Sequence, residues 1–386
     1  MAKFKPAQRL NLPAYPFAEL ERKASAIRAN GSRLHDLSIG DPDLPPPQFV
    51  IDAVKRALDD PASHTYPSSR GNIDVRKTIA KWFQGRFGVE VDPTSQICIT
   101  IGGKEALAQF ARATVNPGEV VAFPDPCYPV FRRAGTFMLD AIPKRLPLFA
   151  ENGFLPKLDK IEGVKLLFVN YPNNPTGASA TESFLQELAV FADNFPSSSV
   201  AYDMAYSEMT FGAPSRSLLE FTPNAVEFHS LSKMANATGY RIGFAIGEPN
   251  RIAALVRVKE EMDSGAPLPF QRALQAVLES YDGTVPPPEL SANRQRYHKR
   301  KQRLESSIKK AGFQLFQTDA TFYIWFKVGA NELSYTNKLV ENHLLLTPGS
   351  GFGEGGIGWV RASVTAPDED IDAAAEIIER IGSEFN

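Results

Sequence analysis

A lysine, two serines and an arginine stand close together in this sequence. A β-like run leads into Ser230, Ser232 and Lys233, and Arg241 follows eight residues after the lysine. Hydroxyls and a guanidinium can hold a phosphate, while a lysine amine can form a Schiff base with a carbonyl. The segment therefore indicates a site for a phosphate-bearing aldehyde, with a solvated turn as the alternative. The apolar residues that follow Arg241 predict that it starts a buried strand.

Two other predicted strands end in polar side chains. The apolar run Ser199–Tyr202 is followed by Asp203, and Tyr206 stands three residues later. The run Lys165–Val169 leads into an N-N-P-T-G turn that contains Asn174. Ligands in open α/β sheets bind at the carboxyl ends of the strands. Asp203, Tyr206 and Asn174 are therefore candidates for binding the same ligand.

These motifs follow one another in a recognisable order. N-N-P-T-G, then D-x-x-Y, then S-x-S-K with its arginine resemble the class I/II aminotransferases, which are fold-type I enzymes that use pyridoxal 5′-phosphate. The resemblance runs from about Leu10 to the C-terminus. It implies an α/β fold, with a mostly parallel sheet in a large domain and a smaller α+β domain. It also implies a homodimer with shared active sites and a ping-pong transamination between an amino acid and a 2-oxo acid.

The resemblance assigns roles around the cofactor. Lys233 forms the Schiff base and moves the proton, Asp203 pairs with the pyridinium nitrogen, and Tyr206 hydrogen-bonds the phenolic oxygen. An exposed lysine, a capping aspartate and a packing tyrosine are the plain alternatives. No metal is expected. The remaining cofactor contacts that match the family are Gly102, Gly103, Lys104, Tyr128, Asn174, Ser230, Ser232, Arg241 and, from the neighbouring subunit, Tyr66.

An arginine inside an apolar strand indicates where the substrate binds. Arg361 lies in the run Trp359–Val364, where a guanidinium without an anion would be costly. Its planar fork suits an α-carboxylate, and the family's carboxylate arginine matches here. A structural salt bridge is the alternative. Gly40 matches the glycine loop that closes over the substrate, and Tyr15 matches a tyrosine of the N-terminal arm that can contact it.

The substrate itself is less well defined. The motifs look most like those of the LL-diaminopimelate and aspartate aminotransferase subgroups. Diaminopimelate enzymes usually carry a glutamate just before the glycine at position 71, where this chain has Arg70. Glu261 stands where an N-x-D-S-G segment has its asparagine. We expect Arg70, reaching across the dimer, to favour a distal carboxylate as in aspartate or glutamate. A pair between Arg70 and Glu261, which would leave a neutral pocket, is the alternative.

Composition narrows the class of partner and the cellular setting. The 42 basic and 44 acidic residues give a net charge of −2, which favours neither nucleic acid nor an anionic membrane as a partner. Two cysteines, Cys98 and Cys127, give no disulfide framework, so a reducing cytoplasm is the expected setting. We expect neither a signal peptide nor a membrane span.

Alternating short strands and amphipathic helices indicate the domain organisation. A length of 386 residues fits two domains. We expect an N-terminal arm at 1–45 that packs with the small domain, a large cofactor-binding domain at 46–285 and a small C-terminal domain at 286–386. Strands are predicted to begin near Ile97, Val120, Lys165, Ser199, Glu227 and Gly243, and later near Phe322 and Trp359, with helices at Glu105–Val115 and Ser291–Lys310.

Two alternatives to transamination remain. The same constellation supports another fold-type I reaction, such as that of a β-lyase or a decarboxylase, because the cofactor carries the hard chemistry. A transcription regulator with an aminotransferase-like domain would need a fused DNA-binding module. Because the pattern begins near Leu10, no such module is expected.

Overall fold

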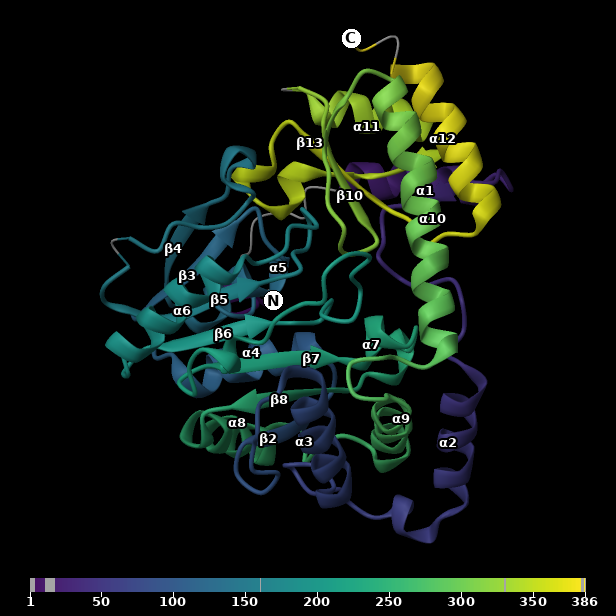
Figure 1. Ribbon diagram of the computed structural model, residues 1–386. Coiled ribbons are helices and arrows are strands. Elements are labelled where there is room, and N and C mark those ends of the chain that lie inside the picture. Colours follow the sequence, from purple (N-terminus) through teal and green to yellow (C-terminus); the bar gives the residue numbers. More distant parts are fainter. Residues whose placement is uncertain (1–3, 11–17, 160, 330, 383–384, 386) are drawn as a thin grey trace.

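The computed structural model describes residues 4–10, 18–159, 161–329, 331–382 and 385. Figure 1 shows a large sheet flanked by helices, and above it a second group of strands and helices from the C-terminal part of the chain. The long helix α10 (Pro288–Lys310) runs along one side and links the two groups. Its first residue is a proline, which is well tolerated at the first position of a helix because its missing N–H would have no helical partner there.

The large sheet has seven strands, and most neighbours in it are parallel. The order is β2-β8-β7-β6-β5-β3-β4, with β8 antiparallel to both of its neighbours. Only a single turn of helix and a 3-10 turn connect β7 to β8, so these strands pair without the long crossover that parallel neighbours need. The strands are β2 (Ile97–Thr100), β3 (Val120–Asp125), β4 (Ile142–Pro147), β5 (Val164–Asn170), β6 (Ser199–Asp203), β7 (Val226–Ser230) and β8 (Gly243–Gly247).

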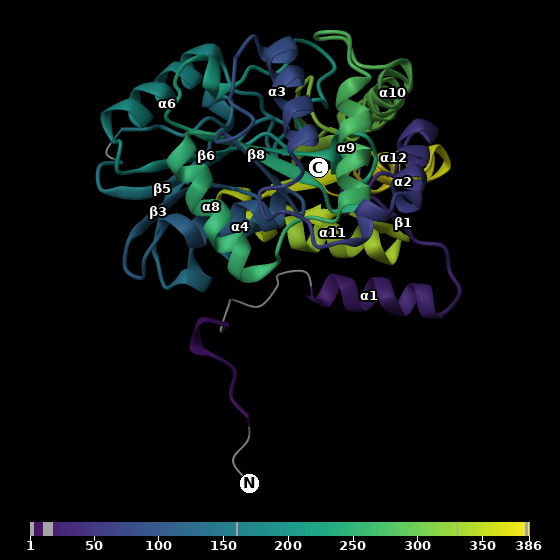
Figure 2. The same ribbon diagram turned by 90° about the horizontal axis from the view of Figure 1, so that it is seen from below.

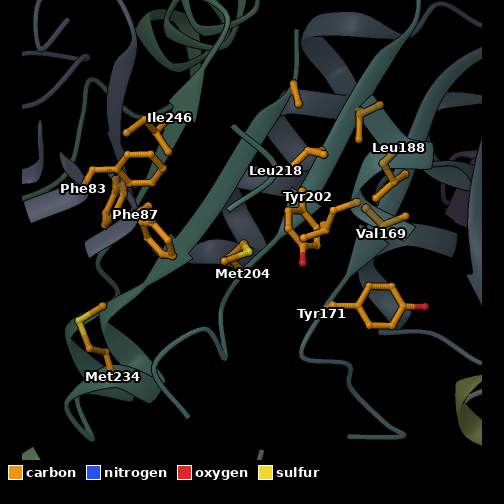
Figure 3. Packing of buried hydrophobic residues seen from close by; sticks show 14 of the residues in the cluster. Phe83, Phe87, Val169, Tyr171, Leu188, Tyr202, Met204, Leu218, Met234 and Ile246 are labelled. Carbon is orange, nitrogen blue, oxygen red and sulfur yellow. The ribbon is translucent and has the colours of Figure 1, made fainter. Parts of the chain in front are cut away.

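Apolar side chains cover both faces of this sheet. Alternate residues of β6 enter different cores: Val200 and Tyr202 join one cluster, and Ala201 joins the other. Figure 3 shows the first of these clusters, including Tyr202 and Leu188. Strands buried on both faces are typical of parallel sheets covered by helices. The helices of this part are α2 (Gln48–Asp59), α3 (Ile73–Phe87), α4 (Gly103–Thr114), α5 (Pro129–Arg132), α6 (Glu182–Asn194), α7 (Leu231–Met234), α8 (Pro249–Met262) and α9 (Leu268–Glu279).

The C-terminal part contains an antiparallel sheet of four strands in the order β12-β13-β10-β9. Its own core contains Phe322, Phe326 and Val360 together with apolar residues of the long helix. Trp325 and Trp359 instead stack on each other and belong to the core cluster that contains Val200 and Tyr202. The elements are β9 (Gln314–Phe316), β10 (Tyr323–Lys327), α11 (Glu332–Glu341), β11 (Leu344–Leu345), β12 (Thr347–Pro348), β13 (Trp359–Ser363) and α12 (Asp368–Gly382).

The N-terminal segment packs against the C-terminal part. Strand β1 (His35–Asp36) pairs in parallel with β11, and helix α1 (Ala18–Ala29) contacts α11. Figure 2 shows α1 lying beside α11 at the edge of the molecule. These contacts agree with an arm that belongs with the small domain. The boundaries at 45 and 285 stay predictions.

The predicted elements are present. Each predicted strand of the large sheet exists, and the first predicted helix corresponds to α4. The helix predicted from Ser291 begins three residues earlier, at Pro288. A mostly parallel α/β sheet with an additional α+β part is therefore the fold of this chain.

Candidate active site

A cavity of about 580 Å³ opens between the carboxyl ends of β5, β6 and β7 and the C-terminal sheet. Twelve of the predicted site residues line it, although they are spread over more than 300 positions of the sequence. Carboxyl strand ends meet at one edge of a parallel sheet, which explains why so many converge. They are Gly40, Gly103, Lys104, Tyr128, Asn174, Asp203, Tyr206, Ser230, Ser232, Lys233, Arg241 and Arg361.

The lysine lies on the short helix α7 that follows β7. Its neighbour Met234 is buried in the core, which fixes the turn from which Lys233 extends (Figure 3). The Lys233 amine donates a hydrogen bond to the carbonyl of Gly40. Burial lowers the pKa of Lys233 to about 8, aided by the positive charge of Arg361 and opposed by Asp41. A substantial fraction of this amine is therefore neutral near pH 8, as a nucleophile or base requires.

Asp203 ends strand β6 and is only 4 % exposed. Its carboxylate accepts a hydrogen bond from the N–H of Ala205 at 3.1 Å, and no ion pair joins it to a lysine, arginine or histidine of the described chain. Burial raises the pKa of Asp203 to about 7, with the Ala205 hydrogen bond acting in the opposite direction. A buried carboxylate in this state would be stabilised by a ligand that brings a protonated nitrogen.

Two serines and Arg241 meet at one end of the cavity. The Ser230 hydroxyl caps α7 by accepting from the N–H of Ser232 at 3.3 Å. Arg241 donates from Nη1 to the carbonyl of Thr238 at 2.9 Å and to the Ser232 hydroxyl at 3.4 Å. The prediction that Arg241 starts a buried strand is wrong. It is an exposed residue at φ +50°, and β8 begins two residues later, so solvent and nearby oxygens stabilise its charge.

The glycine turn before α4 faces the same arginine. Gly102 caps α4 at φ +78°, and a Cβ on it would lie 2.6 Å from Nη2 of Arg241. Glycine avoids both the conformational strain and this collision. The first N–H groups of α4, the two serines and the arginine therefore surround a space suited to a phosphate.

Arg361 extends from β13, lines the cavity and is 7 % exposed. Its Nη1 donates to Asn174 Oδ1 at 2.7 Å, and its Nη2 donates to the carbonyl of Ser38 at 2.6 Å. The guanidinium lies between the rings of Tyr323 and Phe352, 4.2 and 4.6 Å from their centroids. Its Nε has no hydrogen-bond partner, and no carboxylate of the described residues forms an ion pair with it. Such a charge is well placed for an anionic ligand.

Three tyrosines, Tyr128, Tyr206 and Tyr323, complete the walls of the cavity. The Tyr206 and Tyr323 hydroxyls are 2.9 Å apart. Burial, together with the hydrogen bond and charge of Tyr323, raises the pKa of Tyr206 well above its usual range, so Tyr206 is protonated and able to donate. Tyr128 precedes α5, and burial likewise raises its pKa.

Three of the predicted residues that the structure describes, Tyr66, Gly102 and Arg70, do not line the cavity. Tyr15 lies outside the described residues. Tyr66 is 93 % exposed. Gly102 adjoins Arg241, since a Cβ on this glycine would collide with the guanidinium. Arg70 donates to the carbonyl of Ser95 at 2.9 Å, and the described chain contains no ion pair between Arg70 and Glu261. The roles predicted for these residues stay predictions.

Sequence reasoning missed several residues of the cavity. Tyr323 stands in an apolar strand that carries no site motif, yet it contacts both Tyr206 and Arg361. Asn170 was also missed: its Nδ2 donates to the carbonyl of Asp203 at 2.9 Å, and its Oδ1 accepts from the N–H of Asn174 at 2.8 Å. A polar residue at the carboxyl end of β5 was the available signal for Asn170, and the aromatic hydroxyl in an apolar strand was the signal for Tyr323.

Two kinds of feature are absent from the described part of the chain. There, no group of three or more His, Cys, Asp or Glu residues could hold a metal ion. Among the same residues, no helix has both the length and the apolar character to cross a membrane. The two cysteines are free and buried.

The donor set fits pyridoxal 5′-phosphate from end to end. A phosphate cradle, a buried lysine and a buried carboxylate without a cation among the described residues line one cavity, and their chemistry suits a phosphate, an aldehyde and a pyridinium nitrogen. A sequence profile described as aminotransferase class I and II matches residues 32–378. The chain belongs to this family.

Relatives agree with this membership over nearly full length. The chain is 40 % identical to the LL-diaminopimelate aminotransferase of Aquifex aeolicus, over 96 % of this chain and 97 % of that one. Among solved structures it resembles substrate-bound BacF from Bacillus subtilis, with a TM-score of 0.90, 29 % identity and coverage of 99 % and 98 %. It also resembles the aspartate aminotransferase of Thermotoga maritima, with a TM-score of 0.89, 26 % identity and coverage of 97 % and 99 %. This class I/II aminotransferase is thus an enzyme that uses pyridoxal 5′-phosphate and transfers amino groups between amino acids and 2-oxo acids.

Proposed function

We propose that this aminotransferase acts on an α-amino acid whose α-carboxylate is bound by Arg361 and whose reacting carbon faces Lys233. The observation that carries the proposal is the convergence of the Lys233 amine, the Asp203 carboxylate and the Arg361 guanidinium on one cavity. When bound, pyridoxal 5′-phosphate supplies a carbonyl that condenses with amines and a ring that accepts electrons from the breaking Cα–H bond.

The chain's own residues then have distinct tasks. Lys233 would hold the cofactor through its amine, and the same amine would move the proton from the substrate Cα. Asp203, which has no cationic partner of its own, keeps the pyridine nitrogen protonated. Arg361 and Asn174 orient the substrate, which determines the Cα bond that breaks. Tyr206 donates to the phenolic oxygen. The phosphate is bound by Gly103, Ser230, Ser232 and Arg241. Lys104 lines the same cavity, and Gly102 leaves the space that the Arg241 guanidinium occupies.

For the amino donor, we favour LL-diaminopimelate, the substrate named for the relatives that are about 40 % identical over nearly the whole chain. Aspartate or glutamate is the second candidate, because an aspartate aminotransferase is among the similar structures. Under the hypothesis that Arg70 selects a distal carboxylate, Arg70 acts from the partner subunit through guanidinium N–H groups other than those of Nη1, which donates to the Ser95 carbonyl.

We also propose a homodimer with shared active sites. The high exposure of Tyr66 is what a residue that completes the site of a neighbouring subunit would have in the isolated chain. We also propose that the domain boundaries lie at residues 45 and 285. A location in the cytoplasm, where free cysteines persist, is proposed as well.

The test is the visible absorbance of the purified protein with pyridoxal 5′-phosphate, before and after addition of single amino acids. We expect a band that donors convert to the pyridoxamine form in the native protein and that Lys233→Ala lacks. Lys301→Met is the matched control, because burial also lowers the pKa of Lys301 to about 8, although it lies outside the cavity. A band that survives Lys233→Ala would contradict the role of this lysine. A band that no donor changes would favour a lyase or decarboxylase.

The same assay with Arg70→Ala tests the donor. LL-diaminopimelate, aspartate, glutamate and alanine would be compared as single donors. If Arg70 binds a distal carboxylate, the variant loses its preference for aspartate over alanine. An unchanged preference contradicts that role, and the donor with the highest kcat/KM in the native enzyme identifies the substrate.

A further inference from the structure

Tyr323 stands where three parts of the site meet. It is the first residue of β10, is 3 % exposed and lines the cavity. Its hydroxyl lies 2.9 Å from that of Tyr206, and its ring lies under the guanidinium of Arg361. It also touches the loop that carries Gly40, which in turn accepts the hydrogen bond of Lys233. One side chain thus contacts the surroundings of both the cofactor and the substrate.

The pair of hydroxyls constrains the position of the Tyr206 proton. Each tyrosine hydroxyl has a single proton to donate. If Tyr206 donates its proton to the cofactor's phenolic oxygen, the hydrogen bond between the two tyrosines must be donated by Tyr323. A bond in this direction makes the Tyr206 hydroxyl a stronger donor, because chains of hydrogen bonds polarise one another.

The ring of Tyr323 has a second, separate contact. The Arg361 guanidinium lies 4.2 Å from the centroid of this ring and 4.6 Å from the centroid of the Phe352 ring. Aromatic faces attract cations, and most strongly where water is excluded. The two rings therefore hold the guanidinium in place, while its Nε has no hydrogen-bond partner.

The Gly40 loop closes against the same tyrosine. A Cβ at position 40 would collide with the Tyr323 hydroxyl and with two carbons of its ring. The loop therefore approaches this closely only because residue 40 is glycine. Tyr323 thereby sets how far the loop that covers Lys233 can approach.

We propose that Tyr323 is a positioning residue for this aminotransferase, whose hydroxyl orients the Tyr206 hydroxyl and whose ring holds the Arg361 guanidinium. The inference rests on the proposed roles of Tyr206 and Arg361. It assigns two separable functions to one side chain. Removal of the hydroxyl acts through Tyr206 on the cofactor, and removal of the ring acts through Arg361 on the substrate.

The hydroxyl is tested with Tyr323→Phe, which retains the ring. We expect the pH midpoint of the visible absorbance of the cofactor-loaded protein to rise by about 0.5 to 1 unit, because one hydrogen bond that supports the phenolic oxygen is lost. We expect kcat to fall about fivefold to tenfold with little change in KM. Tyr335→Phe is the matched control, because its buried hydroxyl lies in the same C-terminal core without a hydrogen-bond partner. An unchanged midpoint in Tyr323→Phe overturns the role of the hydroxyl.

The ring is tested with Tyr323→Leu. This variant should additionally raise the KM for the amino donor about tenfold, because the stack on Arg361 is gone. A KM equal to that of Tyr323→Phe overturns the role of the ring. A loss of stability alone would not change the pH midpoint of the visible absorbance. Tyr323→Phe therefore tests the hydroxyl even if Tyr323→Leu fails to fold.

Tyr206→Phe separates this inference from the proposed function. If Tyr323 acts through Tyr206, adding Tyr323→Phe to Tyr206→Phe shifts the midpoint no further. A further shift of the same size contradicts the inference alone. If Tyr206→Phe itself leaves the midpoint unchanged, the proposed role of Tyr206 is wrong, and the hydroxyl part of the inference is wrong with it.

Discussion

The guanidinium of Arg361 donates from Nη1 to Oδ1 of Asn174 at 2.7 Å, which joins a strand of the C-terminal sheet to the loop after β5. Because this bond uses the amide oxygen, the NH₂ group is what Asn174 can offer to a ligand. The arginine also donates to the Ser38 carbonyl, and this second bond connects the loop that carries Gly40 to the same guanidinium. The substrate end of the cavity is therefore built from three distant segments around one cation.

Arg361→Lys should weaken substrate binding without disturbing the cofactor. Lysine keeps the charge, but its three N–H donors cannot keep the bonds to Asn174 and Ser38 and also bind a carboxylate bidentately, so we expect a loss of about 2 to 3 kcal/mol, or roughly 30- to 150-fold in kcat/KM. Steady-state kinetics with the best donor would measure this loss. Arg303→Lys, at an exposed pair with Asp372, should be neutral. A loss below threefold for Arg361→Lys would be incompatible with carboxylate recognition at this site.

Gly102→Ala should lower cofactor affinity more than it lowers stability. Alanine at the left-handed φ of +78° destabilises the folded state by about 1 kcal/mol. Its Cβ also displaces the flexible end of the Arg241 side chain. Gly118→Ala is the control, since Gly118 has a similar φ of +81° but open space around it. We expect similar melting temperatures for the two variants and a cofactor Kd raised about tenfold or more in Gly102→Ala alone. Equal Kd values would contradict a phosphate role for Arg241.

Asp203→Asn should change how the stability of the cofactor-free protein depends on pH. The pKa of Asp203 is about 7 in the folded chain, and the reference value for an unfolded chain is about 3.9. Between these values the folded state binds more protons, so the free energy of unfolding falls as pH rises, by about 4 kcal/mol in total for this group. Denaturant unfolding from pH 4 to 8 should show this decline in the native protein and its absence in Asp203→Asn.

The control for this prediction is Asp372→Asn at the surface, which should retain the decline. Adding the cofactor to the native protein should also suppress it, because a protonated nitrogen beside Asp203 lowers its pKa. A decline that persists in Asp203→Asn would show that other groups cause it.

A Tyr66→Ala chain mixed with a Lys233→Ala chain should regain activity. If Tyr66 serves the neighbouring subunit, each hybrid dimer has one site with both defects and one intact site, so random mixing restores about a quarter of the native activity. Lys233→Ala mixed with Arg361→Ala should restore none, because both residues line the cavity of one chain. Activity of the first mixture no higher than that of the separate variants would place Tyr66 outside a shared site.

Local pattern was sufficient to predict most of the fold. Apolar runs such as Ser199–Tyr202 identified strands because burial on both faces of a sheet needs continuous apolar residues. Arg241 shows the limit of such reasoning: the apolar run after it indicated the strand that starts at Gly243, but not that the arginine itself lies outside that strand and is exposed. The orientation of β8, antiparallel within a mostly parallel sheet, also could not be read from composition.

The sequence by itself determined the family, the cofactor and the residues whose motifs are local, such as Lys233 and Asp203, because short-range spacing fixes where a strand end places a side chain. Only the tertiary structure decided which distant groups meet. Tyr323 pairs with Tyr206 across 117 positions, and Lys233 donates to Gly40 across 193. Arg70 likewise bonds to Ser95 in the described chain. Such contacts depend on how whole elements pack against one another, and no local pattern encodes that packing.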